Sequence, residues 1–214
     1  MPHWPGDPQT EIKPVANFDS YGFNLNSLFI GEHTGTHIGA PKHFVDGAAD
    51  VASLEPEQFF VNGIKIDISG QVQNNPDYLL HERDVRNWEK ANGEIDEKSV
   101  VLVQTNWSRN WKDPDIYFGF KNDDMHFPGV SEKAVEYLIT KNINGIGIDS
   151  PGIDGGIGIE FKANKTLAQN GLYHLENLTN LHQLKNRFML LLGALPIEEG
   201  SGSPCRVLAL QEKS

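Results

Sequence analysis

Three histidines lie within a short, glycine-rich stretch of this 214-residue chain, GEHTGTHIGAPKHFVDG at residues 31–47. They are His33, His37 and His43, and the glycines and proline between them make a helix unfavourable. His33 and His37 are therefore not the i, i+4 pair of a helical zinc motif. In an extended strand their Cα atoms would lie roughly 13 Å apart, too far for two imidazoles to bind one ion at about 2.0–2.1 Å. We expect the segment to curl at Gly35 and gather the imidazoles around one point; the alternative is three unrelated loop histidines that hydrogen-bond to backbone.

The overall composition narrows the class of protein. Lys and Arg number 18 against 29 Asp and Glu, a net charge of −11, which argues against a nucleic-acid or anionic-membrane partner. The single cysteine, Cys205, excludes an internal disulfide and a cysteine-rich zinc site. No run approaches the roughly 18 apolar residues of a membrane span, and the first residues lack a signal-peptide pattern. We expect a soluble, cytoplasmic protein.

Hydrophobic periodicity predicts strands and helices mixed along the chain. Strands are expected at 21–31, 61–68 with one buried face, 99–107, 172–178, 187–197 and 205–210, and a short buried strand followed by a Gly/Pro loop is expected within 145–154. Helices are expected at 81–93, ending at Gly93; at 131–145, with Ser131 as N-cap; and at 162–171, ending at Gly171. Residues 1–20, rich in proline, are expected to be extended or turning. Several strands are neighbours in sequence, which favours a single α+β domain over residues 1–214, with a mixed β-sheet flanked by helices.

The histidine stretch also resembles a known signature. HTGTHIGAPKHF at 33–44 is similar to the H-x-G-T-H-x-D-x-P-x-H-F signature of the cyclase family, which includes bacterial kynurenine formamidases and isatin hydrolases. The opening MPHWPGDP resembles the family's M-P-x-x-P-G-D-P, and VVLVQTNWSRNW, HFPGVS, GIGIDSPGID and LENLTNL resemble later landmarks in the same order. The resemblance covers most of the chain. It implies a swivelling β/β/α-like fold and a homodimer or homotetramer.

Residue by residue, the resemblance implies a metal centre with a proton-transfer group beside it. His33 and His37 match metal ligands, His43 matches the catalytic acid/base, and Glu176 matches the family's metal-binding carboxylate. Two histidines and one carboxylate with an open fourth position are a known catalytic zinc arrangement. We therefore expect one divalent ion, Zn²⁺ or Mn²⁺, unless this chain has lost its metal.

Two positions depart from the family pattern. Gly39 stands where the signature has its Asp, and Asn164 stands twelve residues before Glu176, where the family has a histidine of its second metal site. A glycine offers no donor and an amide oxygen is a weak one, so we expect no second ion. His174 lies two residues before Glu176 and faces the same way if the segment is a strand. His174 then either returns an imidazole to the site or simply lies beside the pocket.

The activity that the resemblance implies is hydrolysis of a C–N bond in a small amide, formamide or cyclic amide. A metal can lower the pKa of bound water from 15.7 to about 7, and the hydroxide is expected to attack the carbonyl. His43 would pass a proton to the leaving nitrogen. Aromatic side chains that could line a pocket for an aryl substrate are Trp4, Phe23, Trp107 and Phe127.

Two other functions stay open. The departures at Gly39 and Asn164 also suit a catalytically altered or inactive member that binds a small ligand or a partner. Alternatively, His43 and Glu176 could act as a metal-free acid/base pair in an isomerisation or dehydration.

Overall fold

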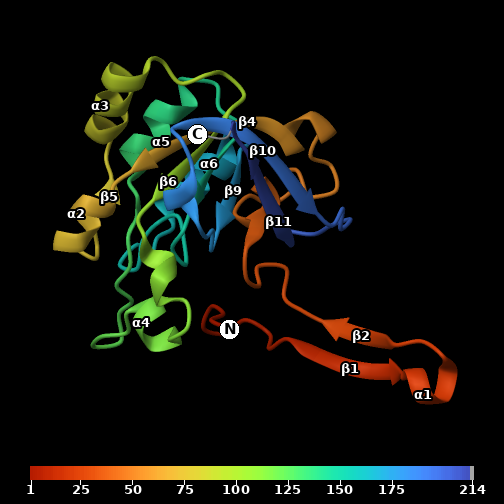
Figure 1. Ribbon diagram of the computed structural model, residues 1–214. Coiled ribbons are helices and arrows are strands. Elements are labelled where there is room, and N and C mark those ends of the chain that lie inside the picture. The colour runs from red at the N-terminus through yellow and green to blue at the C-terminus, as the bar shows by residue number, and fades with distance from the viewer. Residues whose placement is uncertain (213–214) are drawn as a thin grey trace.

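Seven strands curve into a closed barrel in the computed structural model, which describes residues 1–212 (Figure 1). They are β3 (His37–Gly39), β4 (Phe60–Asp67), β6 (Val100–Gln104), β8 (Gly145–Ile148), β9 (Tyr173–Glu176), β10 (Arg187–Ala194) and β11 (Gly202–Leu210). The order around the barrel is β10-β11-β3-β9-β8-β6-β4. Pairing is parallel from β4 through β6 and β8 to β9, and antiparallel elsewhere. The predicted mixed sheet is confirmed, but its closure into a barrel was not expected.

Helices and short connecting elements surround the barrel. The α-helices of the body are α2 (Ser69–Asn74), α3 (Glu82–Asn92), α4 (Pro114–Phe118), α5 (Glu132–Ile139) and α6 (Lys162–Gln169). Short 3₁₀ helices are η1 (Pro41–His43), η2 (Pro56–Phe59), η3 (Trp107–Asn110) and η4 (Leu181–Gln183), and β5 (Leu79–Leu80) pairs with β7 (Gly129–Val130). The predicted N-cap of α5 is confirmed, because the Ser131 hydroxyl accepts the Ala134 N–H at 3.3 Å.

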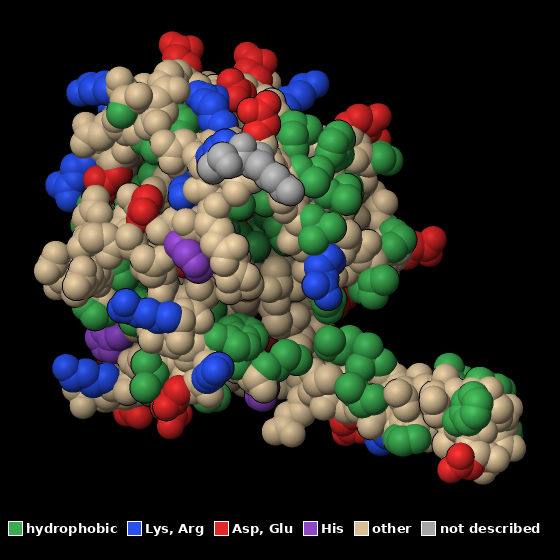
Figure 2. Space-filling model, in the orientation of Figure 1, with side chains coloured by type: hydrophobic (Ala, Val, Ile, Leu, Met, Phe, Trp, Pro, Cys, Tyr) green, Lys and Arg blue, Asp and Glu red, His purple; other side chains and the backbone are tan. Residues whose placement is uncertain are grey.

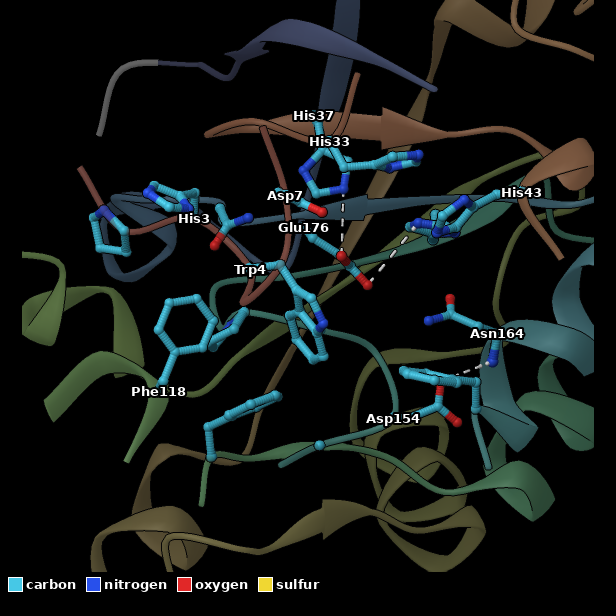
Figure 3. A pocket seen from close by; sticks show the side chains of 18 of the residues that line it. His3, Trp4, Asp7, His33, His37, His43, Phe118, Asp154, Asn164 and Glu176 are labelled. Carbon is cyan, nitrogen blue, oxygen red and sulfur yellow. Dashed lines mark hydrogen bonds and ion pairs between the residues drawn. The ribbon is translucent and has the colours of Figure 1, made fainter. Parts of the chain in front are cut away.

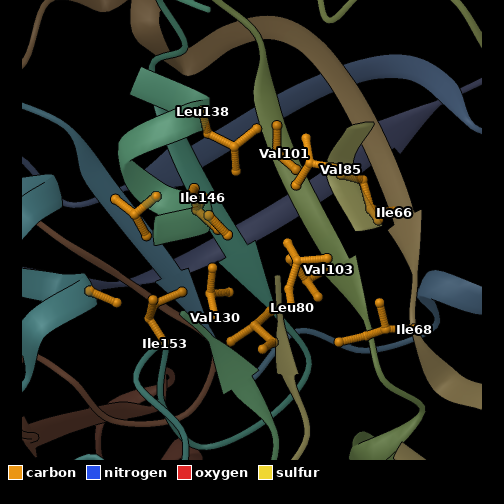
Figure 4. Close-up of a cluster of buried hydrophobic side chains, with 14 of the residues drawn as sticks. Ile66, Ile68, Leu80, Val85, Val101, Val103, Val130, Leu138, Ile146 and Ile153 are labelled. Carbon is orange, nitrogen blue, oxygen red and sulfur yellow. The ribbon is translucent and has the colours of Figure 1, made fainter. Parts of the chain in front are cut away.

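Two layers of buried side chains pack on the two faces of the barrel wall. Val101 and Val103 of β6 belong to an outer cluster with residues of α3, α5 and α6, part of which Figure 4 shows. Val100 and Leu102 belong to a second cluster whose members come largely from the barrel strands. Alternate residues of β6 therefore serve different layers, as the pleat of a strand requires. Burial on both faces explains why β6 is a continuous apolar run.

The prediction of one buried face for β4 is wrong. Residues 63–66 of β4 are all buried, because β4 also faces two layers. Lys65 is among them and is satisfied by donating its ammonium to the Leu184 carbonyl oxygen. The alternation of Ile64 and Ile66 with Lys65 predicts that one face of β4 is exposed to solvent. In the tertiary structure that face is covered as well.

An arm extends from the body near the N-terminus (Figure 1). β1 (Glu11–Ala16) pairs antiparallel with β2 (Leu25–Phe29), and α1 (Phe18–Tyr21) lies at the tip. The helix α1 corrects the expectation that residues 1–20 contain no helix: the Asn17 side chain accepts the Ser20 N–H, and Gly22 ends the helix at φ 74°. Figure 2 shows hydrophobic side chains along this arm.

Within residues 1–212, no helix is both long and apolar enough to cross a membrane.

Candidate functional site

The three signature histidines meet at a cavity of about 280 Å³ on one side of the barrel (Figure 3). The cavity is lined by the opening segment of the chain, the loop before β3, β9, the loop after β8 and the start of α6. Ile38 and Leu175 belong to the cluster of barrel-strand residues, so their sequence neighbours on β3 and β9 face the opposite side of the wall. Those neighbours are the site residues: His37 and Gly39 on β3, with His174 and Glu176 on β9.

The predicted curl at Gly35 is confirmed. Gly35 adopts φ 69°, a left-handed conformation that residues with a Cβ rarely adopt. The turn brings the His33 and His37 rings edge to face, with centroids 4.9 Å apart. The extended arrangement that would have separated the two imidazoles is thereby avoided.

Each of these two imidazoles has one nitrogen held by the protein and one left free. His37 Nδ1 lies 2.9 Å from the Gly35 carbonyl oxygen, to which it donates. His33 Nε2 donates to the Ser201 hydroxyl at 3.0 Å, and that hydroxyl donates to Glu32 at 2.5 Å. Within residues 1–212, His33 Nδ1 and His37 Nε2 are buried without a hydrogen-bond partner. In metal-binding histidines, one ring nitrogen is typically held by a hydrogen bond to the protein, and the other keeps its lone pair free for the metal.

A third imidazole completes a group that fits a metal ion. β3 pairs with β9 so that Gly39 lies opposite His174 and His37 opposite Glu176. One ring nitrogen from each of His33, His37 and His174 lies within 4.8 Å of the others. Two buried free nitrogens and a third beside them are a donor set that suits Zn²⁺ or another imidazole-binding divalent metal.

Burial keeps the His33 and His174 imidazoles neutral. Burial, together with the neighbouring imidazoles, lowers the pKa of His33 to about 2. Burial likewise lowers the pKa of His174 to about 4. Both side chains therefore carry no charge near neutral pH, and the neutral imidazole is the form that binds a metal.

Glu176 lies beside the imidazoles and is ionised. Its Oε2 is 3.3 Å from His37 Nε2, and its Oε1 accepts the Ile153 N–H at 2.9 Å and lies 4.0 Å from His174 Nε2 (Figure 3). Burial opposes ionisation, but His174, His37 and the Ile153 N–H outweigh it and lower the pKa of Glu176 to about 2. The site thus holds one negative charge beside the neutral imidazoles of His33 and His174.

His43 lies at the mouth of the same cavity. It ends the short helix η1, and its ring packs against that of His33 with centroids 3.9 Å apart and against Phe44 at 4.4 Å. His43 is more exposed than His33 or His37. Partial burial against these neighbours lowers its pKa. A neutral imidazole at the entrance, next to the free nitrogens, is well placed to accept a proton.

Asn164 also lines the cavity, in the first turn of α6, and its Oδ1 is buried without a hydrogen-bond partner in the described chain. Asp154 holds the start of this helix by accepting the N–H groups of Ala163 and Asn164 at 2.6 and 3.1 Å. Burial raises the pKa of Asp154 to about 6, against these two hydrogen bonds that lower it. Asn164 therefore presents a free amide oxygen to the pocket, opposite the imidazoles (Figure 3).

Two of the four predicted aromatic residues line the cavity and two do not. Trp4 and Phe127 lie in its wall, with ring centroids 6.2 Å apart. Trp107 is instead a core residue whose indole N–H donates to the Tyr117 carbonyl oxygen at 2.7 Å. Phe23 lies in the arm, where half of it is exposed. The expectation that Phe23 and Trp107 line this pocket is therefore wrong, because an aromatic type in the sequence does not indicate which surface it faces.

Several lining residues were not expected from the sequence. They are His3, Asp7, Phe44, Phe118 and Phe161, among others. His3 and Asp7 belong to the opening MPHWPGDP segment, whose similarity to a family landmark was the one signal that could have indicated them. The phenylalanines come from short irregular segments with no periodicity that could indicate a shared cavity.

Comparison with known sequences gives consistent matches over nearly the whole chain. A family model described as Cyclase, putative cyclase, matches residues 1–155. The isatin hydrolase of Roseibium aggregatum is 34% identical over 220 residues, covering 97% of this chain and 83% of the relative. A kynurenine formamidase of Bacillus cytotoxicus is 26% identical over 206 residues, covering 96% of this chain and 89% of the relative.

Solved structures share the fold. A crystal structure of an isatin hydrolase bound to the product analogue thioisatinate matches with a TM-score of 0.92 and 32% identity, over 97% of this chain and 83% of that one. A potential metal-dependent hydrolase with cyclase activity matches with a TM-score of 0.74 and 25% identity, over 100% of this chain and 93% of that one. These matches confirm the resemblance seen in the histidine signature.

Proposed function

Since this chain belongs to the putative cyclase family, we propose that it is a metal-dependent hydrolase that opens a C–N bond in a small aromatic amide or cyclic amide. The observation that carries this proposal is the pair of buried, unpartnered nitrogens, His33 Nδ1 and His37 Nε2, at the floor of a cavity. Leaving two buried polar atoms unpaired is unfavourable unless something binds them. A divalent cation satisfies both.

His33 and His37 would hold the metal, and β9 would supply the third donor from either His174 or Glu176. Bound there, Zn²⁺ or Mn²⁺ supplies a water of lowered pKa and polarises the substrate carbonyl. The hydrogen bonds from His37 to Gly35 and from His33 to Ser201 keep both rings oriented. The Gly39 and Asn164 departures leave no donor set for a second ion, so one metal per chain is the expected stoichiometry.

His43 carries the proton. Its neutral imidazole at the cavity mouth takes a proton from the attacking water and delivers it to the leaving nitrogen as the C–N bond breaks. The ring of His33 packs beside it and fixes its position. The same ring therefore acts first as a base and then as an acid within one turnover.

The cavity wall suits a flat aromatic substrate. Trp4 meets Phe118 and Phe127 edge to face, with centroid distances of 5.9 and 6.2 Å, and Phe161 lies 6.4 Å from Trp4 on another side. Aromatic pairs prefer such geometry, and a fused ring can pack against this group of side chains. Isatin, named for one relative, combines an aromatic ring with a cyclic amide and fits this description.

The proposal is tested by following hydrolysis of isatin and of formanilide by the same preparation, first stripped with a chelator and then reloaded with Zn²⁺ or Mn²⁺. We expect background rates in the stripped protein, recovery on reloading, and a higher kcat/KM for isatin. Full activity in the stripped protein would instead support metal-free acid/base chemistry. A metal-loaded protein that hydrolyses neither compound would support the inactive, ligand-binding alternative.

The protonation state of His43 gives a further prediction. Burial lowers the pKa of this imidazole, so its NMR titration midpoint in the stripped protein should lie below the ordinary value of 6.5. As the pH falls from neutrality to 6.5, the ring should stay mostly neutral and protonate only at lower pH. The Cε1–H resonance, assigned by its absence from His43→Gln, provides the measurement. A midpoint above 6.5 would contradict the proposed role as a base at neutral pH.

We also propose that the chain assembles with copies of itself, as a dimer or a tetramer, through its arm. The arm leaves Ile12, Phe18, Tyr21, Leu25 and Leu28 at least half exposed, and no residue of α1 is buried. Several exposed apolar side chains gathered on one protruding element are typical of an interface. A second copy offers the same surface by symmetry.

Replacing Phe18 and Leu28 together by aspartate is expected to give a monomer, because each charge would have to be buried at the interface. Mass measured by light scattering during size exclusion tests this. Ile159→Asp is the matched control, since Ile159 is equally apolar, 77% exposed and outside the arm. An oligomer that survives the double change would contradict the proposed role of the arm.

A further inference from the structure

We propose that the third donor of the metal site is His174, and that residue 39 is glycine because the His174 imidazole occupies the space a side chain there would need. This inference rests on the proposed function, and it selects between the two candidate donors on β9. It makes the site a three-imidazole site of His33, His37 and His174, with Glu176 beside it as a charged neighbour.

The contact between Gly39 and His174 carries the first step. A Cβ built on Gly39 would lie 2.0 Å from His174 Nε2 and 2.1 Å from its Cε1, far inside van der Waals contact. The two residues are direct partners across β3 and β9. Gly39 itself lies in a regular strand with no positive φ, so the backbone does not require glycine there. What requires glycine is the ring that lies across it.

The placement of the ring carries the second step. His174 is 3% exposed, and its ring lies beside the packed pair of His33 and His43, at centroid distances of 6.4 and 6.0 Å. It lies edge to face with the His37 ring at 6.1 Å. One of its nitrogens lies within 4.8 Å of a ring nitrogen on each of His33 and His37. Its Nε2 is 4.0 Å from Glu176, too long for a hydrogen bond, so that contact does not occupy it.

Glu176 is held in a different way. Its Oε1 accepts the backbone N–H of Ile153 at 2.9 Å, which fixes the carboxylate, while its Oε2 lies 3.3 Å from His37 Nε2. The Glu176 carboxylate would offset part of the positive charge of a metal ion held by three neutral imidazoles, without itself binding the ion. The backbone hydrogen bond would keep Glu176 in place whether or not the metal is bound.

An all-nitrogen donor set has a consequence for metal choice. Imidazole suits Zn²⁺, whereas Mn²⁺ prefers oxygen ligands such as carboxylates and water. Three histidines with an open fourth position are an established zinc arrangement. We therefore expect Zn²⁺ to bind this chain more tightly than Mn²⁺ by a wide margin.

The sharpest test is Gly39→Ala, which removes no donor atom. The added Cβ must displace the His174 ring, so Zn²⁺ affinity measured by chelator competition should fall by more than about 100-fold, beyond the roughly 10- to 100-fold typical of an outer-shell change. His174→Asn should show a loss of the same size. If Glu176 were the third ligand, both variants would bind Zn²⁺ nearly as the wild type does.

A matched control separates this effect from damage to the barrel. Gly63 on β4 is covered by the ring of Phe188 on β10, its direct cross-strand partner, and a Cβ there would lie 2.2 Å from that ring. Gly63→Ala therefore introduces the same kind of clash away from every metal donor. It should lower the melting temperature but leave Zn²⁺ affinity within a few-fold of wild type. If Gly63→Ala also lost zinc, the loss in Gly39→Ala would report only on folding. The inference drawn from Gly39→Ala would then be overturned.

A double change provides a positive outcome that a folding defect cannot imitate. In Gly39→Asp with His174→Ala, the ring is gone and a carboxylate can enter the vacated space. Zn²⁺ affinity should recover at least about tenfold over His174→Ala alone, and Co²⁺ substituted for zinc should show a changed visible spectrum because a nitrogen ligand is replaced by oxygen.

The outcomes for Glu176 distinguish this inference from the proposed function. Glu176→Gln should keep one Zn²⁺ per chain, with affinity lowered by no more than the roughly 10- to 100-fold typical of an outer-shell change. If Glu176→Gln loses zinc while His174→Asn keeps it, the inference is overturned and the metal-dependent hydrolase remains. If the wild-type chain binds no metal at all, the proposed function itself fails, and the inference fails with it.

Discussion

Replacing His43 by alanine is expected to reduce kcat/KM for isatin by about 10²- to 10⁴-fold, the range typical of a lost general acid/base. The bound metal should be unchanged, because His43 is not in the group of three imidazoles whose nitrogens converge. The melting temperature should also change little, since His43 is an exposed residue at the cavity mouth whose ring is only partly buried. Metal content by elemental analysis and steady-state rates on the same sample provide the measurement.

His182→Ala is the matched control for His43→Ala. His182 is an exposed histidine on η4, outside the cavity, and its removal should leave both rate and metal content unchanged. A His43→Ala protein that keeps its zinc and hydrolyses isatin at the wild-type rate would show that another group transfers the proton. A loss of zinc in His43→Ala would place His43 among the ligands.

The second large effect is expected from His37→Ala, which should abolish both metal binding and hydrolysis. His37 lies at the start of β3, 2% exposed, with its Nε2 free and facing His33 and His174. Removing it takes away one of the two buried, free nitrogens on which the metal site depends. A metal that binds only the folded state stabilises it, by about 2.7 kcal/mol at a concentration 100 times its Kd. Zinc should therefore raise the melting temperature of the wild type and leave that of His37→Ala unchanged.

The pair of variants separates two roles within one histidine cluster. His43→Ala should respond to zinc in the melting assay as the wild type does, although it no longer hydrolyses the substrate. His37→Ala should fail in both assays. Equal zinc stabilisation of His37→Ala and wild type would contradict the placement of the metal at His33 and His37, whatever the hydrolysis rates show.

Local sequence was enough to predict much of this molecule. The apolar runs of β6 and β10 indicate strands, and Ser131 and Gly171 mark helix ends, because hydrophobic periodicity and capping act over a few neighbouring residues. The curl at Gly35 could also be predicted locally, because it follows from the spacing of His33 and His37 and from the glycine between them. The signature that contains them is a continuous run of residues, so the family resemblance is visible without knowing how the chain folds.

Sequence alone did not predict how distant segments meet. The pairing of β3 with β9, which places His174 across from Gly39, joins segments that are far apart in the chain. With only three residues, β3 is also too short for a hydrophobic pattern to be recognised in the sequence. Closure of the sheet into a barrel buried both faces of β4. Packing also decided that Trp107 lies in the core and that Phe23 lies exposed in the arm. Residue types and spacing thus determined which chemistry this chain can perform. Cross-strand register and packing, which depend on contacts between distant segments, decided which side chains surround the site.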